Sequence, residues 1–184
     1  MLNRDEAFAL LQEKVHEPQQ LSHAIETEAV LRALARRLGR DEDLWGVAGL
    51  LHDLDYASTK DNPLRHGAEA AEMLAGKLPE EAVHAIHAHN EMTGCLPESE
   101  FDFALRCGET VTGLIHTNAL VRPTGMAGMA PKSLKKKMKD KAFAASVNRE
   151  IIKECEKIGL DLGEFFQISV DAITEVAAEV GLAK

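Results

Sequence analysis

Apolar residues recur along most of the chain at the three- and four-residue spacing of amphipathic α-helices. No segment alternates convincingly with the period of two that marks a half-buried strand. Proline or glycine interrupts the pattern at plausible helix boundaries, for example at Pro18, Gly39 and Pro79. The chain is therefore predicted to be all-α, with helices near residues 3–16, 19–38, 42–53, 65–77, 79–91, 99–121, 142–158 and 162–180.

The composition agrees with packed helices in one domain. The chain has 184 residues, of which 45% are hydrophobic but only 4% are aromatic. A core of Leu, Ala, Val, Ile and Met suits helices better than a β-sandwich, which favours aromatic and β-branched residues. At this length a single domain covering residues 1–184 is the natural expectation.

Charge and cysteine content exclude several classes of protein. The net charge of −9 disfavours a nucleic-acid binder, which needs excess lysine and arginine to neutralise phosphates. Cys95, Cys107 and Cys155 form no CxxC pair, so neither a disulfide framework nor a thiolate zinc site is predicted. The acidic N-terminus does not resemble a signal peptide, and no apolar stretch has the length of a membrane span. We expect a cytoplasmic protein without a membrane partner.

Residues 122–131 form the one long loop that the pattern predicts, and a basic run follows it. Asp140 is the only acid within this run. A charge run usually lies on a solvated helix face. The alternative is a phosphate-attracting lip beside an active site. The run contains Lys132, Lys135, Lys136, Lys137, Lys139 and Lys141.

Histidines lie on the apolar stripes of three predicted helices. His23 shares a stripe with Val30 and Leu34, and we interpret this stripe as buried because Glu26, Arg32 and Arg36 lie off it. His66 shares a stripe with Ala70, Met73 and Leu74. In the helix predicted over 79–91, His89 lies on the apolar face, whereas His84 and His87 point to solvent or to the rim of a cleft.

Two further positions offer carboxylates. Glu109 is the only acid between Phe103 and Val121, and burying a carboxylate is costly unless it is paired or binds a metal. The alternative is a surface pair of Glu109 with Arg106. His52 and Asp53 stand side by side at the end of an apolar helix, and adjacent side chains diverge by about 100° on a regular helix. Both can face one centre only where the helix ends or where the centre lies between them.

The ordered set of His23, His52-Asp53, His66, His89 and Glu109 resembles the HD-domain metal-dependent phosphohydrolases, in their HDIG-like branch. The resemblance extends over about residues 20–180. It implies an HD-domain helical bundle with a core of about 19–121 and a C-terminal helical extension of about 131–184. It also implies that His23, His52, Asp53 and Glu109 hold one metal, and that Asp53 bridges to a second metal held by His66 and His89.

Two positions depart from the family pattern. The family's last acid is usually Asp, whereas Glu109 stands here. The Ile-Gly-Lys that often follows the HD pair is replaced by Leu54-Asp55-Tyr56, which removes the usual lysine.

The resemblance implies hydrolysis of a phosphoester or phosphoanhydride bond, in a small phosphorylated substrate such as a nucleotide, by a metal-bound hydroxide. Imidazole and carboxylate ligands suit one or two divalent ions of Fe, Mn, Zn, Co or Ni. Asp53 and Asp55 are the expected catalytic carboxylates, although Asp55 could equally serve as a helix cap. The expected contacts to substrate phosphate are Arg122, Lys135, Lys139 and Arg149.

Two other functions stay open at this point. One is a non-catalytic metal- or nucleotide-binding HD module, which the Glu109 departure makes plausible. The other is a di-iron oxygenase, because similar ligand sets in the wider HD superfamily activate oxygen. The apolar helix faces are also compatible with a homodimer.

Overall fold

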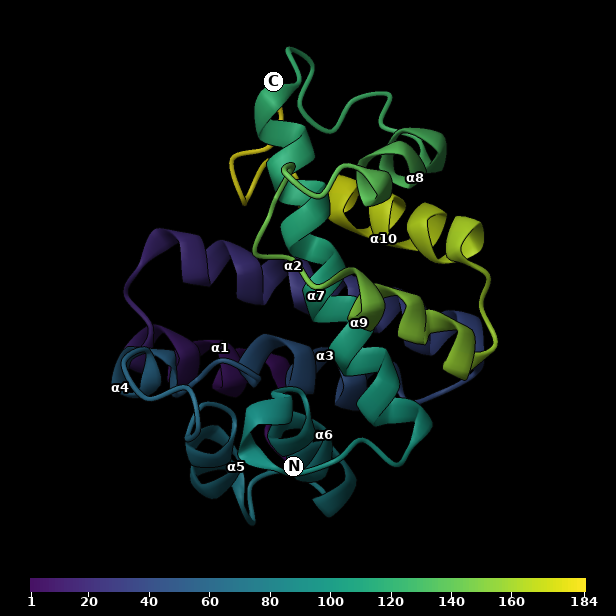
Figure 1. The fold of residues 1–184 in the computed structure, drawn as a ribbon. Coiled ribbons are helices and arrows are strands. Elements are labelled where there is room, and N and C mark those ends of the chain that lie inside the picture. The colour runs from purple at the N-terminus through teal and green to yellow at the C-terminus, as the bar shows by residue number, and fades with distance from the viewer.

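The computed structural model describes residues 1–184, and these form an all-α protein, as predicted (Figure 1). No strand is present, only one isolated bridge between Ala75 and Leu78. The α-helices are α1 (Arg4–Lys14), α2 (Pro18–Leu38), α3 (Glu42–Leu51), α4 (Tyr56–Thr59), α5 (Ala68–Leu74), α6 (Glu80–Ala88), α7 (Glu100–Val121), α8 (Pro131–Lys139), α9 (Arg149–Lys153) and α10 (Leu162–Val176). Two short 3₁₀ helices are η1 (Glu91–Thr93) and η2 (Glu154–Ile158).

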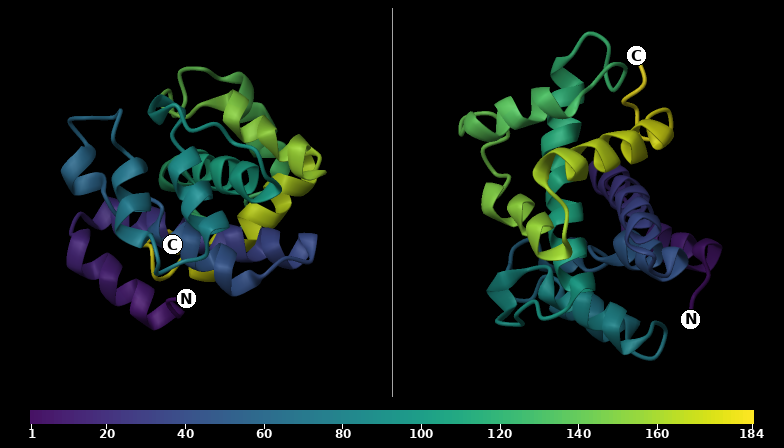
Figure 2. Two further views of the ribbon diagram at one scale, coloured as in Figure 1. Left: turned by 90° about the horizontal axis from the view of Figure 1, so that it is seen from below. Right: turned by 90° about the vertical axis from the view of Figure 1, so that its right-hand side faces the viewer.

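Helix α7 runs through the length of the molecule, and α2, α3, α6, α8, α9 and α10 pack against it (Figures 1 and 2). Helix α2 contacts α3, α7 and α10, so it is covered on several sides. Helix α8 lies near the C-terminal end of α7, α9 flanks the middle of α7, and α6 packs towards its N-terminal end (Figure 1). The ends of α3 and α6 thereby come close to the N-terminal half of α2 and the middle of α7.

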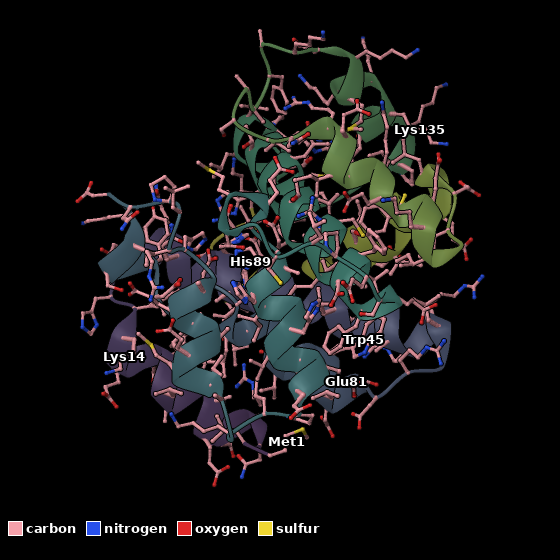
Figure 3. The ribbon with its side chains drawn as sticks, turned by 60° about the horizontal axis from the view of Figure 1, so that its bottom comes forward. Met1, Lys14, Trp45, Glu81, His89 and Lys135 are labelled. Atoms are coloured by element: carbon pink, nitrogen blue, oxygen red, sulfur yellow. The ribbon has the colours of Figure 1, made fainter.

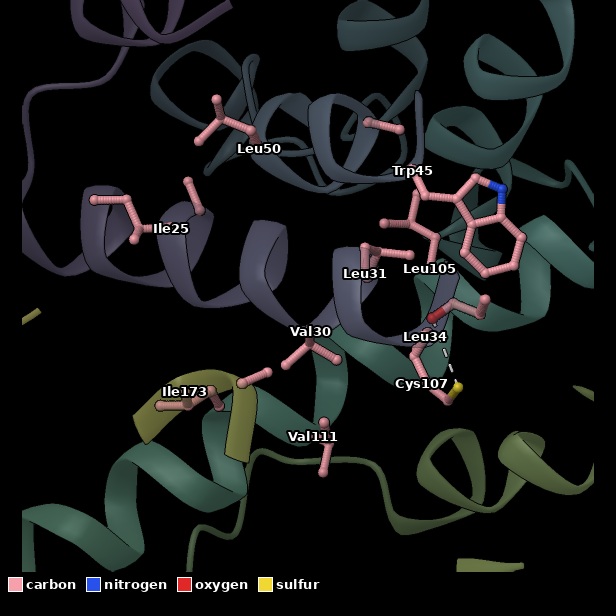
Figure 4. Packing of buried hydrophobic residues seen from close by; sticks show 14 of the residues in the cluster. Ile25, Val30, Leu31, Leu34, Trp45, Leu50, Leu105, Cys107, Val111 and Ile173 are labelled. Atoms are coloured by element: carbon pink, nitrogen blue, oxygen red, sulfur yellow. Dashed lines mark hydrogen bonds between the residues drawn. The ribbon is translucent and has the colours of Figure 1, made fainter. Parts of the chain in front are cut away.

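One continuous hydrophobic core joins these helices. Leu31 and Leu34 of α2, Leu50 of α3 and Leu105 of α7 have no exposed surface (Figure 4). Gly108 allows the close approach of α7 to α2, because a Cβ there would lie 2.7 Å from a methyl carbon of Leu31. The core therefore fixes the spacing of the two helices that carry His23 and Glu109.

Residue-level signals explain several helix ends. Ser99 and Asp102 form a capping box at the start of α7, where Asp102 Oδ2 accepts hydrogen bonds from the amides of Glu98 and Ser99. Pro18 occupies the first turn of α2, and Gly39 ends that helix with a left-handed φ of 67°. The proline and glycine boundaries read from the sequence are thus confirmed for α2.

The helix predicted over 142–158 is wrong. Residues 141–147 form turns, α9 begins only after Asn148, and η2 follows it. The Asn148 side chain accepts a hydrogen bond from the amide of Glu150, which favours a new helix start there. A short helix, α8, instead forms within the basic run. The predicted helices over 65–77 and 79–91 are shorter than expected, since α5 and α6 begin later and end earlier.

The interpretation of Glu26 as lying off the buried stripe is also wrong. Its side chain is 1% exposed and accepts a hydrogen bond from Nδ1 of His116, with 2.6 Å between the atoms. The assumption of one buried face is wrong for α2, because three neighbouring helices cover it on several sides.

No helix of the structure has both the length and the apolar character needed to cross a bilayer. All three cysteines are free thiols; Cys107 and Cys155 are buried and Cys95 is partly exposed.

Candidate metal centre

Four histidines and Asp53 converge where α2, α3 and α6 meet the turn before α5. His23 lies on α2, His52 caps the C-terminus of α3, and His89 caps the C-terminus of α6, where it is labelled in Figure 3. Helix α3 ends at Leu51, so His52 and Asp53 leave the regular helix and face the same point. The sequence indicated that both residues can face one centre where the helix ends, and the helix does end here. His66 precedes α5 rather than lying on it, yet its side chain also faces inward.

His23 and His52 form the first of two facing imidazole pairs. Their Nε2 atoms are 3.1 Å apart. Nδ1 of His52 is 2.8 Å from the carbonyl oxygen of Gly49 and must donate to it. Nδ1 of His23 is 2.9 Å from Oγ1 of Thr112. The Thr112 hydroxyl donates its hydrogen to the carbonyl of Glu109, so it must accept a hydrogen bond from Nδ1 of His23. Both Nε2 atoms therefore present lone pairs to each other.

His66 and His89 form the second facing pair, with 3.2 Å between their Nε2 atoms. Nδ1 of His89 is 2.6 Å from the carbonyl oxygen of Ile86, and Nδ1 of His66 is 3.0 Å from Oδ1 of Asp55. Each of these partners is an acceptor, so each Nδ1 carries the proton. The second pair thus also directs its Nε2 atoms inward.

Asp53 lies between the two pairs. Its Oδ1 is 3.2 Å from Nε2 of His52, 3.1 Å from that of His66 and 3.5 Å from that of His89. Its Oδ2 is 3.7 Å from Nε2 of His23. Burial raises the pKa of the Asp53 carboxyl, but the surrounding imidazoles outweigh burial and hold this pKa well below its usual value. Asp53 is therefore an anion in contact with all four rings.

This donor set fits a divalent metal. Facing lone pairs repel unless a proton or a cation lies between them, and a carboxylate adds negative charge at the same point. Burial lowers the pKa of His52 to about 3, which keeps its imidazole neutral and able to bind a metal. Burial also disfavours charge on His66, but its bonds to Asp53 and Asp55 prevail and raise its pKa to about 10. A metal ion at this point would replace the proton of His66.

Two groups of metal-ligating atoms meet the distance requirement for a shared ion. His23, His52 and Glu109 form one group, and His52, Asp53 and His89 form the other, with all ligand atoms within 4.8 Å of one another in each. These groups contain five of the six residues named from the sequence, and His66 joins them through its contact with Asp53 at 3.1 Å, while His84 and His87 lie apart from them. His84 Nδ1 is 3.1 Å from Oδ2 of Asp102.

Asp55 orients one histidine of the centre and caps a helix, while its expected catalytic role stays a prediction. It is 1% exposed, and its Oδ1 holds His66. Its Oδ2 accepts hydrogen bonds from the amides of Gly67 and Ala70, at 2.7 and 3.0 Å, and so caps α5. Asp55 thereby sets the orientation of His66 without lining the cavity itself.

Glu109 lies at the edge of the centre, on α7. Its Oε2 is 3.9 Å from Nε2 of His23. Burial raises the pKa of the Glu109 carboxyl, and the nearby imidazoles only partly offset this effect. The predicted alternative, a surface pair with Arg106, is wrong. Arg106 is buried and forms an ion pair with Glu154 at 2.8 Å, while its guanidinium also donates to the carbonyls that end α6.

A cavity of about 370 Å³ opens above the centre. His23, Asp53, His66, His89 and Glu109 form its floor. Its walls add Asn90, Glu91, Met92, Thr110, Gly113, Ser146, Val147, Asn148 and Ile151. The contribution of residues 146–151 was not assigned from the sequence, because their approach depends on how the C-terminal segment folds back over α7. The resemblance did extend over Val147 and Asn148, which is the one signal that pointed to them.

None of the four residues expected to contact phosphate lines this cavity. The Arg122 guanidinium donates to the carbonyls of Gly125 and Ala127 and shapes the loop after α7. Lys135, Lys139 and Arg149 line a different hollow. Their role as substrate contacts stays a prediction.

Comparison with known proteins agrees with this geometry. Residues 21–106 match the family model described as the HD domain. The chain is 36% identical over 95 residues to ribonuclease Y of Lawsonia intracellularis, a match that covers 50% of this chain and 18% of that protein. No solved structure matches significantly. The matched region contains His23, His52, Asp53, His66 and His89, so residues 21–106 belong to the HD domain family.

Proposed function

We propose that this chain is a metal-dependent phosphohydrolase that acts on a small phosphorylated substrate of the nucleotide class. The observation that carries this proposal is the pair of facing imidazole contacts around the Asp53 carboxylate, at the floor of an open cavity. HD domains generally house such chemistry, and the buried cluster supplies the ligands that a divalent ion requires.

The proposed ligands are those that the family pattern implies. His23, His52, Asp53 and Glu109 would hold one ion, while Asp53, His66 and His89 would hold a second. A divalent ion at this centre supplies an activated water at neutral pH and polarises a phosphoryl oxygen.

The chain itself orients the ligands and shapes the substrate cavity. The carbonyls of Gly49 and Ile86, the hydroxyl of Thr112 and the carboxylate of Asp55 each hold one imidazole at Nδ1. Rotation of any ring would break a buried hydrogen bond, so all four Nε2 atoms stay aimed at the centre. The walls supply hydrogen-bonding side chains from Thr110, Ser146 and Asn148, which suit a polar ligand.

The name of the bacterial relative raises the question of an RNA substrate. That protein is called a ribonuclease, but this chain spans only 18% of its length. A net charge of −9 opposes an extended polyanion, because each phosphate needs a cation to offset its repulsion. A small phosphorylated molecule that enters the cavity meets this repulsion much less, so we favour it as the substrate.

The test combines metal analysis with a screen for phosphate release. The purified protein is expected to carry Fe, Mn, Zn, Co or Ni and to release phosphate from one class of nucleotide or phosphoester with the metal that it carries. His52→Ala and Asp53→Ala are expected to lose metal and activity while their circular dichroism spectra keep the helical signal. His87→Ala is the matched control, because this histidine lies on α6 outside the cluster.

Two results would contradict the proposal. Stoichiometric metal and nucleotide binding without any turnover would indicate a binding module. Iron-dependent oxygen consumption with an organic substrate, without phosphate release, would indicate an oxygenase. A short RNA belongs in the same screen, since its cleavage in preference to nucleotides would overturn the substrate class alone.

A further inference from the structure

The lysines of the basic run differ from most of the arginines of this acidic chain, because none of them forms an ion pair with a carboxylate. Seven of the nine arginines form an ion pair with a carboxylate. None of the six lysines between Lys132 and Lys141 does so. Acids outnumber bases by 30 to 21 in the whole chain, whereas Asp140 is the only acid within this run. The result is a local positive potential on a negative protein.

Three of these unpaired lysines line a hollow of about 780 Å³ between α8, α9 and the start of α10, at the end of the molecule where Lys135 is labelled in Figure 3. They are Lys135, Lys139 and Lys141. The hollow contains one carboxylate, that of Glu150, which is already paired with Lys153 at 2.7 Å. Apolar side chains of Met138, Ala145, Val147 and Leu162 complete the wall. The hollow therefore combines unneutralised cations with an apolar surface.

One wall of the hollow is a turn that is held in an uncommon conformation. Ala144 has a φ of 44°, in the left-handed region that non-glycine residues rarely adopt. The Arg149 guanidinium holds this turn, because it donates to the carbonyls of Asp140, Phe143, Ala144 and Val147. Arg149 thus shapes the wall, which leaves the lysines as the groups free to contact a ligand. Strained backbone of this kind persists only where the surroundings enforce it.

The same turn separates the hollow from the cavity above the metal centre. Val147 and Asn148 line both spaces. Five of the six proposed metal ligands line the first space, and none of the six lines the hollow, so an occupant of the hollow would contact neither His23 nor Asp53. It would, however, contact the wall of the neighbouring cavity.

We propose that this hollow is a second binding site, separate from the metal centre, for a phosphorylated small molecule of the nucleoside di- or triphosphate class. The lysines supply charge-assisted hydrogen bonds to phosphate oxygens, and the apolar wall supplies a surface for the base. The volume lies within the range of small-molecule sites, roughly 300–1,000 Å³. The inference stands on this surface alone and does not depend on the proposed hydrolase activity.

Binding of adenosine triphosphate and of inorganic phosphate to the full chain, measured by calorimetry in excess chelator, tests the site without a contribution from bound metal. The double variant Lys139→Glu/Lys141→Glu is expected to weaken triphosphate binding by about tenfold or more, because a charge-assisted hydrogen bond contributes roughly that factor. Lys132→Glu/Lys136→Glu is the matched control. It makes the same change in net charge at exposed positions in the same run, outside the hollow.

The control variant is expected to bind nearly as the wild type does, and His52→Ala is expected to bind unchanged. Equal weakening in both lysine variants would show diffuse charge attraction and overturn the site. Loss of binding in His52→Ala would place the ligand in the metal centre instead. A short RNA that binds more tightly than the triphosphate, with the same dependence on Lys139 and Lys141, would overturn the small-molecule assignment.

Discussion

Oδ1 of Asp55 accepts a hydrogen bond from Nδ1 of His66 at 3.0 Å, and this contact decides which nitrogen of His66 faces Asp53. A carboxylate can only accept here, so Nδ1 keeps its proton, and Nε2 is the nitrogen that would give up its proton to bind a metal. The position belongs to the segment Leu54-Asp55-Tyr56, where the chain departs from the family pattern. The departure therefore supplies a residue that supports the centre.

Asp55→Asn is expected to impair the centre while keeping the fold. The asparagine oxygen can still accept from the Gly67 amide, which turns its NH₂ group toward His66. Nδ1 of His66 must then accept, the proton moves to Nε2, and metal binding by this ring is blocked. We expect metal affinity or activity to fall by about 10- to 100-fold, the usual effect of removing a residue that supports a ligand.

Metal titration of the variant against the wild type measures this change. Asp61→Asn is the control, since Asp61 is exposed and forms neither a side-chain hydrogen bond nor an ion pair. Wild-type metal affinity in Asp55→Asn would show that His66 does not need this partner.

Gly67→Ala tests the close approach of the turn before α5 to His89. Gly67 has a φ of 85°, and a Cβ there would lie 3.0 Å from Cε1 of His89. Gly76 has a similar φ of 74° but open space around it, so Gly76→Ala reports the backbone strain alone. We expect that strain to destabilise either variant by about 1 kcal/mol. Only Gly67→Ala is expected to lose metal affinity as well, because it displaces the His89 ring.

Thermal unfolding with and without added metal separates the two effects. Equal shifts of Tm in both variants under both conditions would mean that the His89 ring is not displaced.

The His116–Glu26 pair predicts a dependence of stability on pH. The hydrogen bond to Glu26 raises the pKa of His116 above its ordinary value of 6.5. A raised pKa in the folded state means that the protonated form is stabilised by folding. This contribution is complete below pH 6.5 and is lost as the pH rises through the folded-state pKa. The His116→Gln variant lacks this stabilising contribution at every pH.

Urea unfolding of both proteins in chelator, at about pH 6 and at about pH 9, isolates this pair because the other titrating groups are common to both. The wild type is expected to be the more stable protein at the lower pH, with the difference shrinking at the higher pH. A difference in unfolding free energy that stays constant across this range would contradict the ion pair.

The inward placement of the histidines and Asp53 could be predicted from the sequence, because it depends largely on local periodicity or on a helix end. His23 and His89 lie on helices with a clear apolar face, and the dipeptide His52-Asp53 marks the end of one. His66 was predicted to face inward for a partly wrong reason, since the helix begins only after it. Its orientation comes instead from Asp55, eleven positions earlier in the chain.

The remaining features depend on contacts between distant segments. Ser146, Val147, Asn148 and Ile151 reach the cavity only because the turn held by Arg149 folds back over α7. The burial of Glu26 depends on His116, which is ninety positions later. Helical periodicity carries no information about either contact. The hollow beside α8 could not be predicted for the same reason, since a run of charges alone does not indicate which lysines line a common space.

Glu109→Asp tests the departure from the family residue at the last acid. Oε2 of Glu109 is 3.9 Å from Nε2 of His23, the longest of the ion-pair distances within the centre. Its backbone position is fixed, because Gly108 packs tightly against Leu31. We expect Glu109→Asp to keep or raise phosphatase activity, since it restores the family carboxylate and a bound ion can draw the shorter side chain inward. Glu109→Gln, which keeps the length but not the charge, is expected to lose both metal and activity.

Measuring phosphate release at matched metal content distinguishes the effect of side-chain length on activity from the effect of side-chain charge at this position. Full loss of activity in Glu109→Asp, together with retained metal, would show that the longer side chain is matched to this centre. If both variants keep their bound metal, Glu109 is not one of the ligands. Asp53, which contacts all four imidazoles, would then be the only anion at the centre. Asp53 and the imidazoles would have to bind the metal without a ligand from α7.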